Sequence, residues 1–387
     1  MVKRLPPPSS LLHLARRWAA FLLLVALLVP VAVYRSWIDA QLAAYVVLAT
    51  TIDTPVLKWI AAAATEGPRI EETPIAGQEA TVVRPGSGKR WPAIVFANGA
   101  TEEGRLHPEV QRLARGLARA DFLVVVPELP GLRQGEITVR TLSALVQVAR
   151  ATADRSDAED GRVGFIGVSV GSSLALAAAE DPALAGRVSA LAGIAPYADL
   201  KEVARLATTG YIRSGGTLQA YPTDDFVLLA VARSLSSSLP LGRDRDRFLA
   251  QLAAIPNERD NPLAGFTLPT DAGPGARALF QLLAGGDPHS FDGLWRRLPR
   301  RVRDDAELLS PIARADRLTM PVELATSPED DYFPVSESRR LAHASRHVRV
   351  TVTETLSHAV PEPSLDGLGA AFRFDGFVLR SLRALRR

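Results

Sequence analysis

The 387-residue chain contains no cysteine. This absence excludes disulfide bonds, thiolate metal sites and a cysteine nucleophile. Of the six histidines, His343 and His347 lie four residues apart, but they fall on a predicted helix rich in arginine and are expected to be solvated, so we expect neither a metal nor a cofactor. An excess of charge is also missing, because 45 basic residues face 42 acidic ones. The arginines are scattered among acids and alanines, which is typical of a solvated surface and predicts no nucleic-acid partner.

Low-complexity tracts and internal repeats are absent as well. Apolar residues make up 47% of the chain and charged residues 22%, which are values of an ordinary globular protein. The length allows one main domain with a large core and an insertion.

An unbroken apolar run at residues 18–34 follows four basic residues and is closed by Arg35. At about 1.5 Å rise per residue the run spans roughly 25 Å, enough to cross a bilayer core. We therefore predict a signal or anchor helix over residues 1–35. The basic flank should stay cytoplasmic, which would make the protein membrane-anchored with an extracytoplasmic body. A cleaved secretory signal is the alternative, although no small-x-small site follows the run.

Residues 36–67 are interpreted as a linker or an interfacial helix. The segment is apolar, but Asp53, Pro55 and Lys58 interrupt it. A charge at mid-bilayer costs about 2.5–3.5 kcal/mol, which disfavours a second span. If the segment did span, the body would return to the cytoplasm.

Short apolar runs separated by amphipathic stretches organise the body of the chain. Runs rich in valine and isoleucine suit strands buried on both faces of a parallel sheet. Their alternation with helical patterns predicts an α/β fold with a doubly wound, mostly parallel sheet. The expected strands are residues 79–84, 93–97, 122–126, 163–168, 188–194, 322–326 and 348–353.

The alternation stops between residues 197 and 316. This stretch contains helical patterns at 225–235 and 277–283 and many turn residues. We predict a helical lid or cap inserted at the edge of the sheet where catalytic loops emerge. The core would then comprise residues 68–196 and 317–387.

The pentad Gly167-Val168-Ser169-Val170-Gly171 joins a predicted strand to an alanine-rich helix. A serine between two glycines at such a junction is typical of a nucleophile elbow, where larger flanking side chains would collide with neighbouring backbone. Serine is a poor nucleophile at neutral pH, so this reading requires a base and an acid nearby.

Both appear downstream in the order found in the α/β-hydrolases, which the chain resembles from about residue 69 to its C-terminus apart from the insertion. The loop after strand 322–326 contains Asp330, four residues before a proline, and Asp331 is the alternative acid. The loop after strand 348–353 carries His358. The resemblance implies that Ser169 is the nucleophile, His358 the general base, and Asp330 the residue that orients the imidazole.

The same resemblance implies an oxyanion hole. The backbone N–H of Val170, after the nucleophile, would supply one donor. Asn98-Gly99-Ala100-Thr101 resembles the family's His-Gly-x segment with asparagine in place of histidine, and the N–H of Ala100 would be the second donor. His107 follows this segment and is expected to start a helix.

Together these residues predict a serine hydrolase that cleaves a carboxylic ester through an acyl-enzyme, similar to the dienelactone-hydrolase and peptidase-like branches. A peptidase or acyltransferase using the same triad is the alternative, and a non-catalytic membrane-tethered binding protein is a third hypothesis. The expected partners are a small-molecule or lipid-like ester and, through the N-terminal helix, a membrane. Most aromatic residues of the insertion are expected to form its own core.

Overall fold

The computed structural model describes residues 41, 43, 66–358, 360–361 and 368–387. The predicted anchor helix at residues 18–34 lies outside this range, as does most of the segment 36–67. No helix within the described ranges is both long and apolar enough to cross a bilayer.

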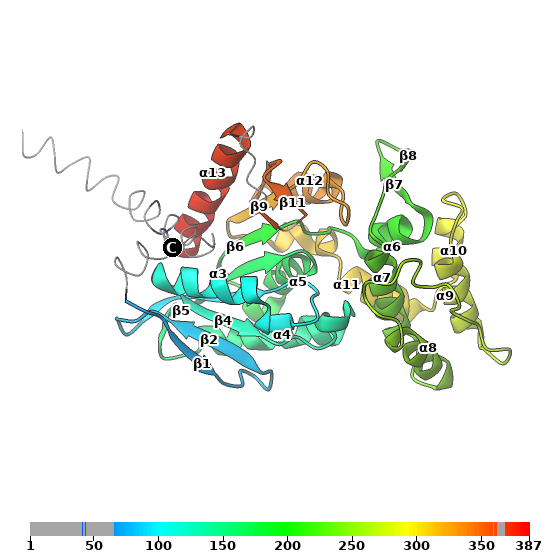
Figure 1. Ribbon diagram of the computed structural model, residues 1–387, viewed down its shortest axis with the longest axis horizontal. Helices are drawn as coiled ribbons and strands as arrows, with labels where there is room; N and C mark the ends of the chain where they lie inside the picture. The colour runs from blue at the N-terminus through cyan, green and yellow to red at the C-terminus, as the bar shows by residue number, and fades with distance from the viewer. Residues whose placement is uncertain (1–40, 42, 44–65, 359, 362–367) are drawn as a thin grey trace, which may run out of the picture.

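An eight-stranded sheet forms the centre of the fold, in the order β1-β2-β4-β3-β5-β6-β9-β10 (Figure 1). The neighbours of β2 run antiparallel to it, and the other neighbouring strands run parallel. The strands are β1 (Arg69–Glu72), β2 (Ala80–Arg84), β3 (Trp91–Ala97), β4 (Leu123–Pro127), β5 (Ala158–Val168), β6 (Val188–Ile194), β9 (Val322–Thr326) and β10 (Val348–Val352). A mostly parallel sheet of this kind confirms the predicted α/β fold class and fits an α/β-hydrolase fold.

Helices cover both faces of the sheet, which explains the continuous apolar runs of its central strands. Helices α4 (Val139–Ala153) and α5 (Val170–Ala179) pack on one face, where they meet Val163 and Phe165 of β5. Helices α3 (Pro108–Arg119) and α13 (Leu368–Leu385) cover the opposite face, toward which Ile166 points.

Between β6 and β9 the chain builds helices and one β-hairpin on one side of the sheet (Figure 1). The expected helices at 225–235 and 277–283 correspond to α7 and α9, whereas the hairpin was not predicted. The elements are α6 (Leu200–Thr209), β7 (Tyr211–Ser214), β8 (Thr217–Ala220), α7 (Asp225–Ser237), α8 (Arg243–Ala253), α9 (Pro274–Ala284), α10 (Phe291–Arg297) and α11 (Arg300–Leu308). We call residues 197–316 the insertion.

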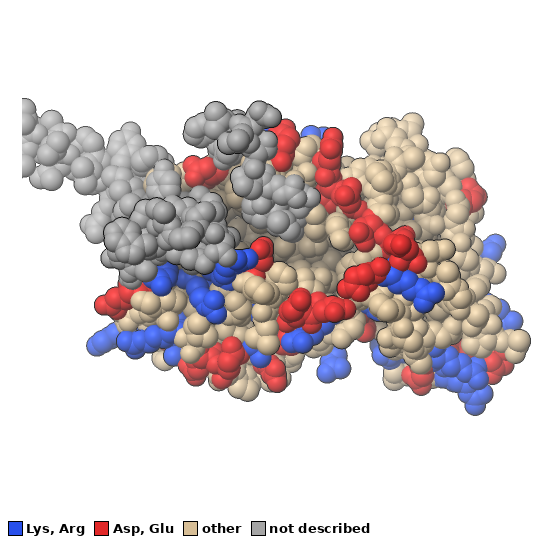
Figure 2. Space-filling view, viewed as in Figure 1, with Lys and Arg blue, Asp and Glu red and all other residues tan. Residues whose placement is uncertain are grey.

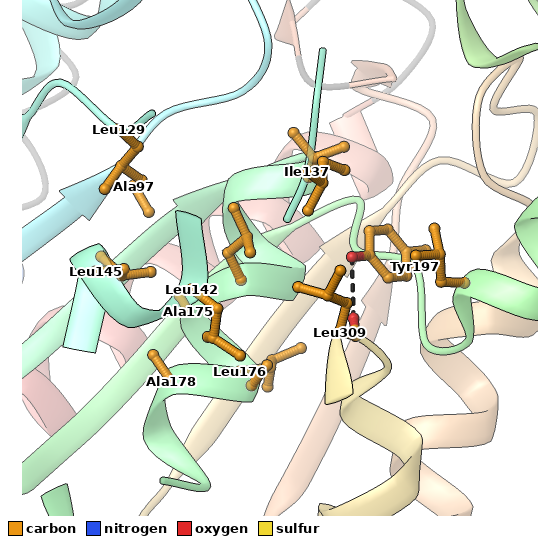
Figure 3. Close-up of a cluster of buried hydrophobic side chains, with 14 of the residues drawn as sticks. Ala97, Leu129, Ile137, Leu142, Leu145, Ala175, Leu176, Ala178, Tyr197 and Leu309 are labelled. Carbon is orange, nitrogen blue, oxygen red and sulfur yellow. Dashed lines mark hydrogen bonds between the residues drawn. The ribbon is translucent and has the colours of Figure 1, made fainter. Parts of the chain in front are cut away.

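The insertion shares the larger hydrophobic core with the sheet, part of which is shown in Figure 3. Tyr197 lies at this junction, fully buried, and its hydroxyl donates to the carbonyl of Leu309 at 3.0 Å. Burial raises the pKa of Tyr197, so its phenol stays protonated and remains a donor. The end of the insertion is thereby tied to the loop that follows β6.

Two elements complete the region around His358. Helix α12 (Val335–Ala344) connects β9 to β10. After β10, the short strand β11 (Leu356–Ser357) pairs with β12 (Val360–Pro361) and brings His358 to the C-terminal edge of the sheet.

Candidate active site

Ser169 occupies a strained turn between β5 and α5. Its φ of 54° and ψ of −128° are unfavourable for a residue with a side chain, and such strain gathers at functional sites. The turn leaves no room beside the serine. A Cβ on Gly167 would lie 2.4 Å from Ser172 Cα, and one on Gly171 would lie 2.2 Å from the carbonyl oxygen of Ala97. Both glycines are therefore required by close backbone approach, as the sequence pattern predicted.

The side chains of Ser169, His358 and Asp330 meet at the C-terminal edge of the sheet. His358 Nε2 lies 2.9 Å from Ser169 Oγ. On the other side of the ring, His358 Nδ1 lies 2.9 Å from each carboxylate oxygen of Asp330. Three residues spread over 189 positions of the chain thus form one hydrogen-bonded relay.

Asp330 is held from two directions, whereas Asp331 points elsewhere. The backbone N–H groups of Tyr332 and Phe333 donate to Asp330 Oδ1 at 2.8 and 2.9 Å, and the Asp330 side chain is fully buried. Asp331 is exposed, and its carbonyl accepts from the N–H of Asp224 at 2.8 Å. Of the two acids that the sequence left open, Asp330 is the one that contacts the imidazole.

The insertion holds in place the loop that carries Asp330, residues 327–334, which we call the acid loop. The Tyr221 hydroxyl donates to the carbonyl of Asp330 at 2.6 Å, and burial, followed by the Asp330 carboxylate, raises the pKa of Tyr221. Tyr221 was interpreted from the sequence only as part of the insertion's aromatic surface. Its hydrogen bond joins residues that are 109 positions apart, and a local sequence pattern cannot predict a contact over that separation.

Aromatic rings pack on the imidazole of His358. The ring of Tyr332 stacks on it at a centroid distance of 4.2 Å and an interplanar angle of 29°, and Phe333 approaches edge-on at 6.0 Å. These rings restrict the orientations of the imidazole and exclude water from one side. The amino-acid sequence alone did not predict this role for Tyr332 and Phe333.

The two predicted oxyanion donors belong to residues that border the serine. Ala100 and Val170 line the same cavity as Ser169 and His358. The preceding Gly99 packs so closely that a Cβ on it would lie 3.5 Å from Ser169 Cβ. Asn98, which replaces the histidine of the family's segment, is buried and donates from Nδ2 to the carbonyl of Gly99 at 2.9 Å.

His107 starts helix α3, as expected. Its Nδ1 accepts from the backbone N–H of Glu109 at 3.3 Å, and Pro108 occupies the first helical position. The residue also lines the cavity near Ser169. No group of three or more His, Asp or Glu side chains in the described part of the chain could hold a metal ion.

A cavity of about 430 Å³ opens at Ser169, which is within the usual range for small-molecule sites. Helices α6 and α7 form one wall, to which Phe226 contributes. Most other aromatic side chains of the insertion pack among themselves, as expected from the sequence. Phe266 contacts Phe248 and Phe280, and Phe291 stacks on Trp295.

Carboxylates gather on the surface where the core meets the insertion (Figure 2). Asp224, Asp225, Glu329 and Asp331 are all exposed there, on the turn before α7 and on the acid loop that contacts it. Their combined field disfavours the approach of an anionic substrate and is screened by salt.

No protein-family model matches the chain, and no curated protein matches it. Solved structures that resemble it include the acylaminoacyl peptidase of Pyrococcus horikoshii, at 14% identity over 80% of this chain and a TM-score of 0.46. Est1E from Butyrivibrio proteoclasticus matches at 13% identity over 82% of this chain, with a TM-score of 0.44. A membrane phospholipase A described as a bacterial virulence factor matches at 16% identity over 94%, with a TM-score of 0.42.

The chain spans 40% of the length of that peptidase and 99% of the length of each of the other two proteins. Identities and TM-scores at this level carry no substrate over to this chain. The chemistry has to be argued from the site itself.

Proposed function

We propose that the protein is a serine hydrolase that cleaves carboxylic esters through an acyl-enzyme. The observation that carries the proposal is the relay in which His358 Nε2 lies 2.9 Å from Ser169 Oγ while Nδ1 contacts Asp330. This geometry is within reach of proton transfer.

In the proposed reaction, Ser169 Oγ attacks the acyl carbon and His358 Nε2 takes the serine proton. Asp330 stabilises the resulting imidazolium without accepting the proton. The N–H groups of Ala100 and Val170 would donate to the oxyanion. His358 then protonates the leaving alcohol as the C–O bond breaks, and the reverse sequence with water releases the acid and regenerates Ser169.

The side chains that line the cavity are mostly aliphatic and aromatic, which supports an ester in preference to a peptide. A peptide bound in this space would bury several amide groups, and each one without a hydrogen-bond partner costs about 1–3 kcal/mol. An acyl chain has no such groups to satisfy. The exposed carboxylates near the acid loop also support a neutral or cationic alcohol part.

Turnover of short p-nitrophenyl esters and labelling by a fluorophosphonate test the proposal. Ser169→Ala should abolish both. Ser172→Ala is the matched control, because it removes a serine hydroxyl from α5, the helix that Ser169 precedes. The Oγ of Ser172 is buried and has no hydrogen-bond partner among the described residues. Loss of labelling in both variants, or in neither, would contradict the assignment of Ser169. Product analysis with an added alcohol or amine acceptor separates hydrolysis from acyl transfer.

We further propose that the protein is anchored in a membrane by residues 18–34, with its body outside the cytoplasm. The support is the uninterrupted apolar run and its basic flank. Protease treatment of intact spheroplasts should degrade the body, and protection of the body would contradict this orientation.

A further inference from the structure

The cavity at Ser169 continues around the C-terminal edge of the sheet onto the face covered by α3 and α13. Its lining includes side chains from both of those helices and from the strands beneath them. We call this part the α3–α13 arm. It is defined by Phe96, Leu113, Ile166, Ala192, Phe377 and Leu382.

The arm is deep. Leu385 of α13 lines it, and the Leu385 side chain abuts β5 at Gly164, where an added Cβ would lie 2.3 Å from Leu385 Cδ2. Gly164 precedes Ser169 by five residues, and a strand rises about 3.3 Å per residue, so the arm reaches roughly 16 Å from the serine. A fully extended chain advances about 1.2 Å per bond, so this depth corresponds to about 13 bonds.

The walls of the arm are aliphatic and aromatic. The exception on the described part of α13 is Ser381, which contributes a hydroxyl group to the lining. Helices α3 and α13 also keep large apolar side chains only partly covered, among them Val110, Leu113, Phe374 and Val378. On the opposite wall Phe226 is partly covered too, whereas Leu200, Val227 and Val231 of α6 and α7 are buried in the larger core. Apolar surface that is half-covered and faces a cavity indicates an apolar ligand.

We propose that the α3–α13 arm holds the acyl chain of the substrate, which would make the preferred ester a medium- to long-chain one of about 10 to 13 carbons. This inference rests on the proposed serine hydrolase function and specifies its substrate class. The competing occupant is the chain's own N-terminal part, since Ala43 is buried in the same hydrophobic cluster.

A chain-length series of p-nitrophenyl esters on the full-length protein tests the proposal. Each methylene that enters the arm should raise kcat/KM by up to about fourfold. The ratio of kcat/KM for the decanoyl ester to that for the butyryl ester should therefore exceed about tenfold. A flat or falling series would overturn the proposal and favour an arm filled by the chain itself.

Two tryptophan substitutions on α3 locate the acyl chain. Leu113→Trp adds bulk inside the arm and should lower the decanoyl-to-butyryl ratio at least about tenfold. Arg115→Trp is the matched control, because Arg115 is exposed on the same helix and should leave the ratio unchanged. Ala230→Leu adds bulk at the α7 wall, and if it lowered the ratio while Leu113→Trp did not, the acyl chain would lie on that side instead.

Binding to Ser169→Ala separates failure of this inference from failure of the proposed function. If the wild-type protein turned over no ester and Ser169 resisted labelling, the hydrolase proposal would fail. On Ser169→Ala, the displacement of a fluorescent twelve-carbon acyl probe by methyl dodecanoate would then still be measurable. If adding Leu113→Trp weakens the binding of the probe, the arm is supported as an acyl site. If the probe does not bind at all, the proposal is overturned.

Discussion

Replacing Gly171 by alanine should damage both stability and catalysis through one displacement of the backbone. The new Cβ would lie 2.2 Å from the carbonyl oxygen of Ala97 and 2.3 Å from that of Asn98. Both distances are roughly 1 Å inside normal van der Waals contact. Because the opposing atoms are backbone, no side-chain rotation relieves the overlap, and the end of β3 must move away from α5.

The structure sets the size of both effects. Overpacking costs about 1–3 kcal/mol, and a clash against backbone belongs at the upper end, so we expect about 3 kcal/mol. At an unfolding entropy of about 2.1 cal/mol/K per residue, this lowers the Tm of a chain of this size by about 4 °C. The displaced segment leads directly to Ala100, and a shift of about 1 Å in a positioning group can cost about 100-fold in rate.

Thermal unfolding followed by circular dichroism, together with ester kinetics, measures both effects. Gly99→Ala is the control for stability, because its Cβ would meet Ser169 Cβ and the carbonyl of Val168 at 3.5 Å, an ordinary contact. That variant should unfold within about 2 °C of the wild type. The reasoning is refuted if Gly171→Ala keeps the wild-type Tm and kcat.

Three further predictions separate roles around the site and the core. Asp330→Asn should lower kcat about 10⁴-fold while Asp331→Asn changes it less than about threefold, and equal losses in steady-state kinetics would contradict the geometry. Tyr221→Phe should lower the free energy of unfolding by about 1 kcal/mol, measured by thermal unfolding, and should lower kcat with little change in KM. An unaltered kcat would show that the acid loop does not need this hydrogen bond. Burial outweighs the attraction of Arg314 and raises the pKa of Glu180 from the ordinary 4.5 to about 8. The contribution of Glu180 to stability is therefore present at pH 4.5 and is lost as the pH rises toward 8. The free energy of unfolding of the wild type should fall relative to that of Glu180→Gln by up to about 1.4 kcal/mol per pH unit. If the two free energies changed with pH in parallel, the prediction would be contradicted.

The parts of the fold that the sequence predicted are those in which burial and local pattern agree. Strands β4 and β6 are buried on both faces, so they stand out as apolar runs in which Ser189 is the single polar residue. The elbow was predictable for a different reason. Gly167 and Gly171 are dictated by contacts with backbone close by, and the pentad therefore carries its own geometry.

Elements without a buried face escaped prediction. All four residues of β1 are exposed, and three of them are charged, so β1 is recognisable only from its pairing with β2. The strands β7 and β8 of the hairpin likewise contain no buried residue. Strand β5 begins at Ala158, earlier than expected, and this start was missed because residues 159–162 carry no apolar signal.

The sequence favoured Asp330 over Asp331 through its spacing from the following proline, but the geometric reason for that choice appears only in the structure. Both residues are aspartates that follow the same strand, so residue type alone does not separate them. The difference is the direction of the side chain in a turn, which is fixed by the N–H groups of Tyr332 and Phe333. A turn that binds one carboxylate through two amides leaves its neighbour facing solvent.

The turn before α7 connects the size of the cavity to the geometry of the triad. Asp224 caps α7 by accepting from the N–H of Phe226 at 2.8 Å, and its own N–H donates to the carbonyl of Asp331. Phe226 lines the cavity, while Tyr221, at the other end of the same turn, bonds to Asp330. A movement of α7 that widens the cavity therefore also displaces the loop that orients His358. It follows that the insertion cannot be exchanged as an independent specificity element, because any replacement must rebuild the support of the catalytic acid as well as the wall of the pocket.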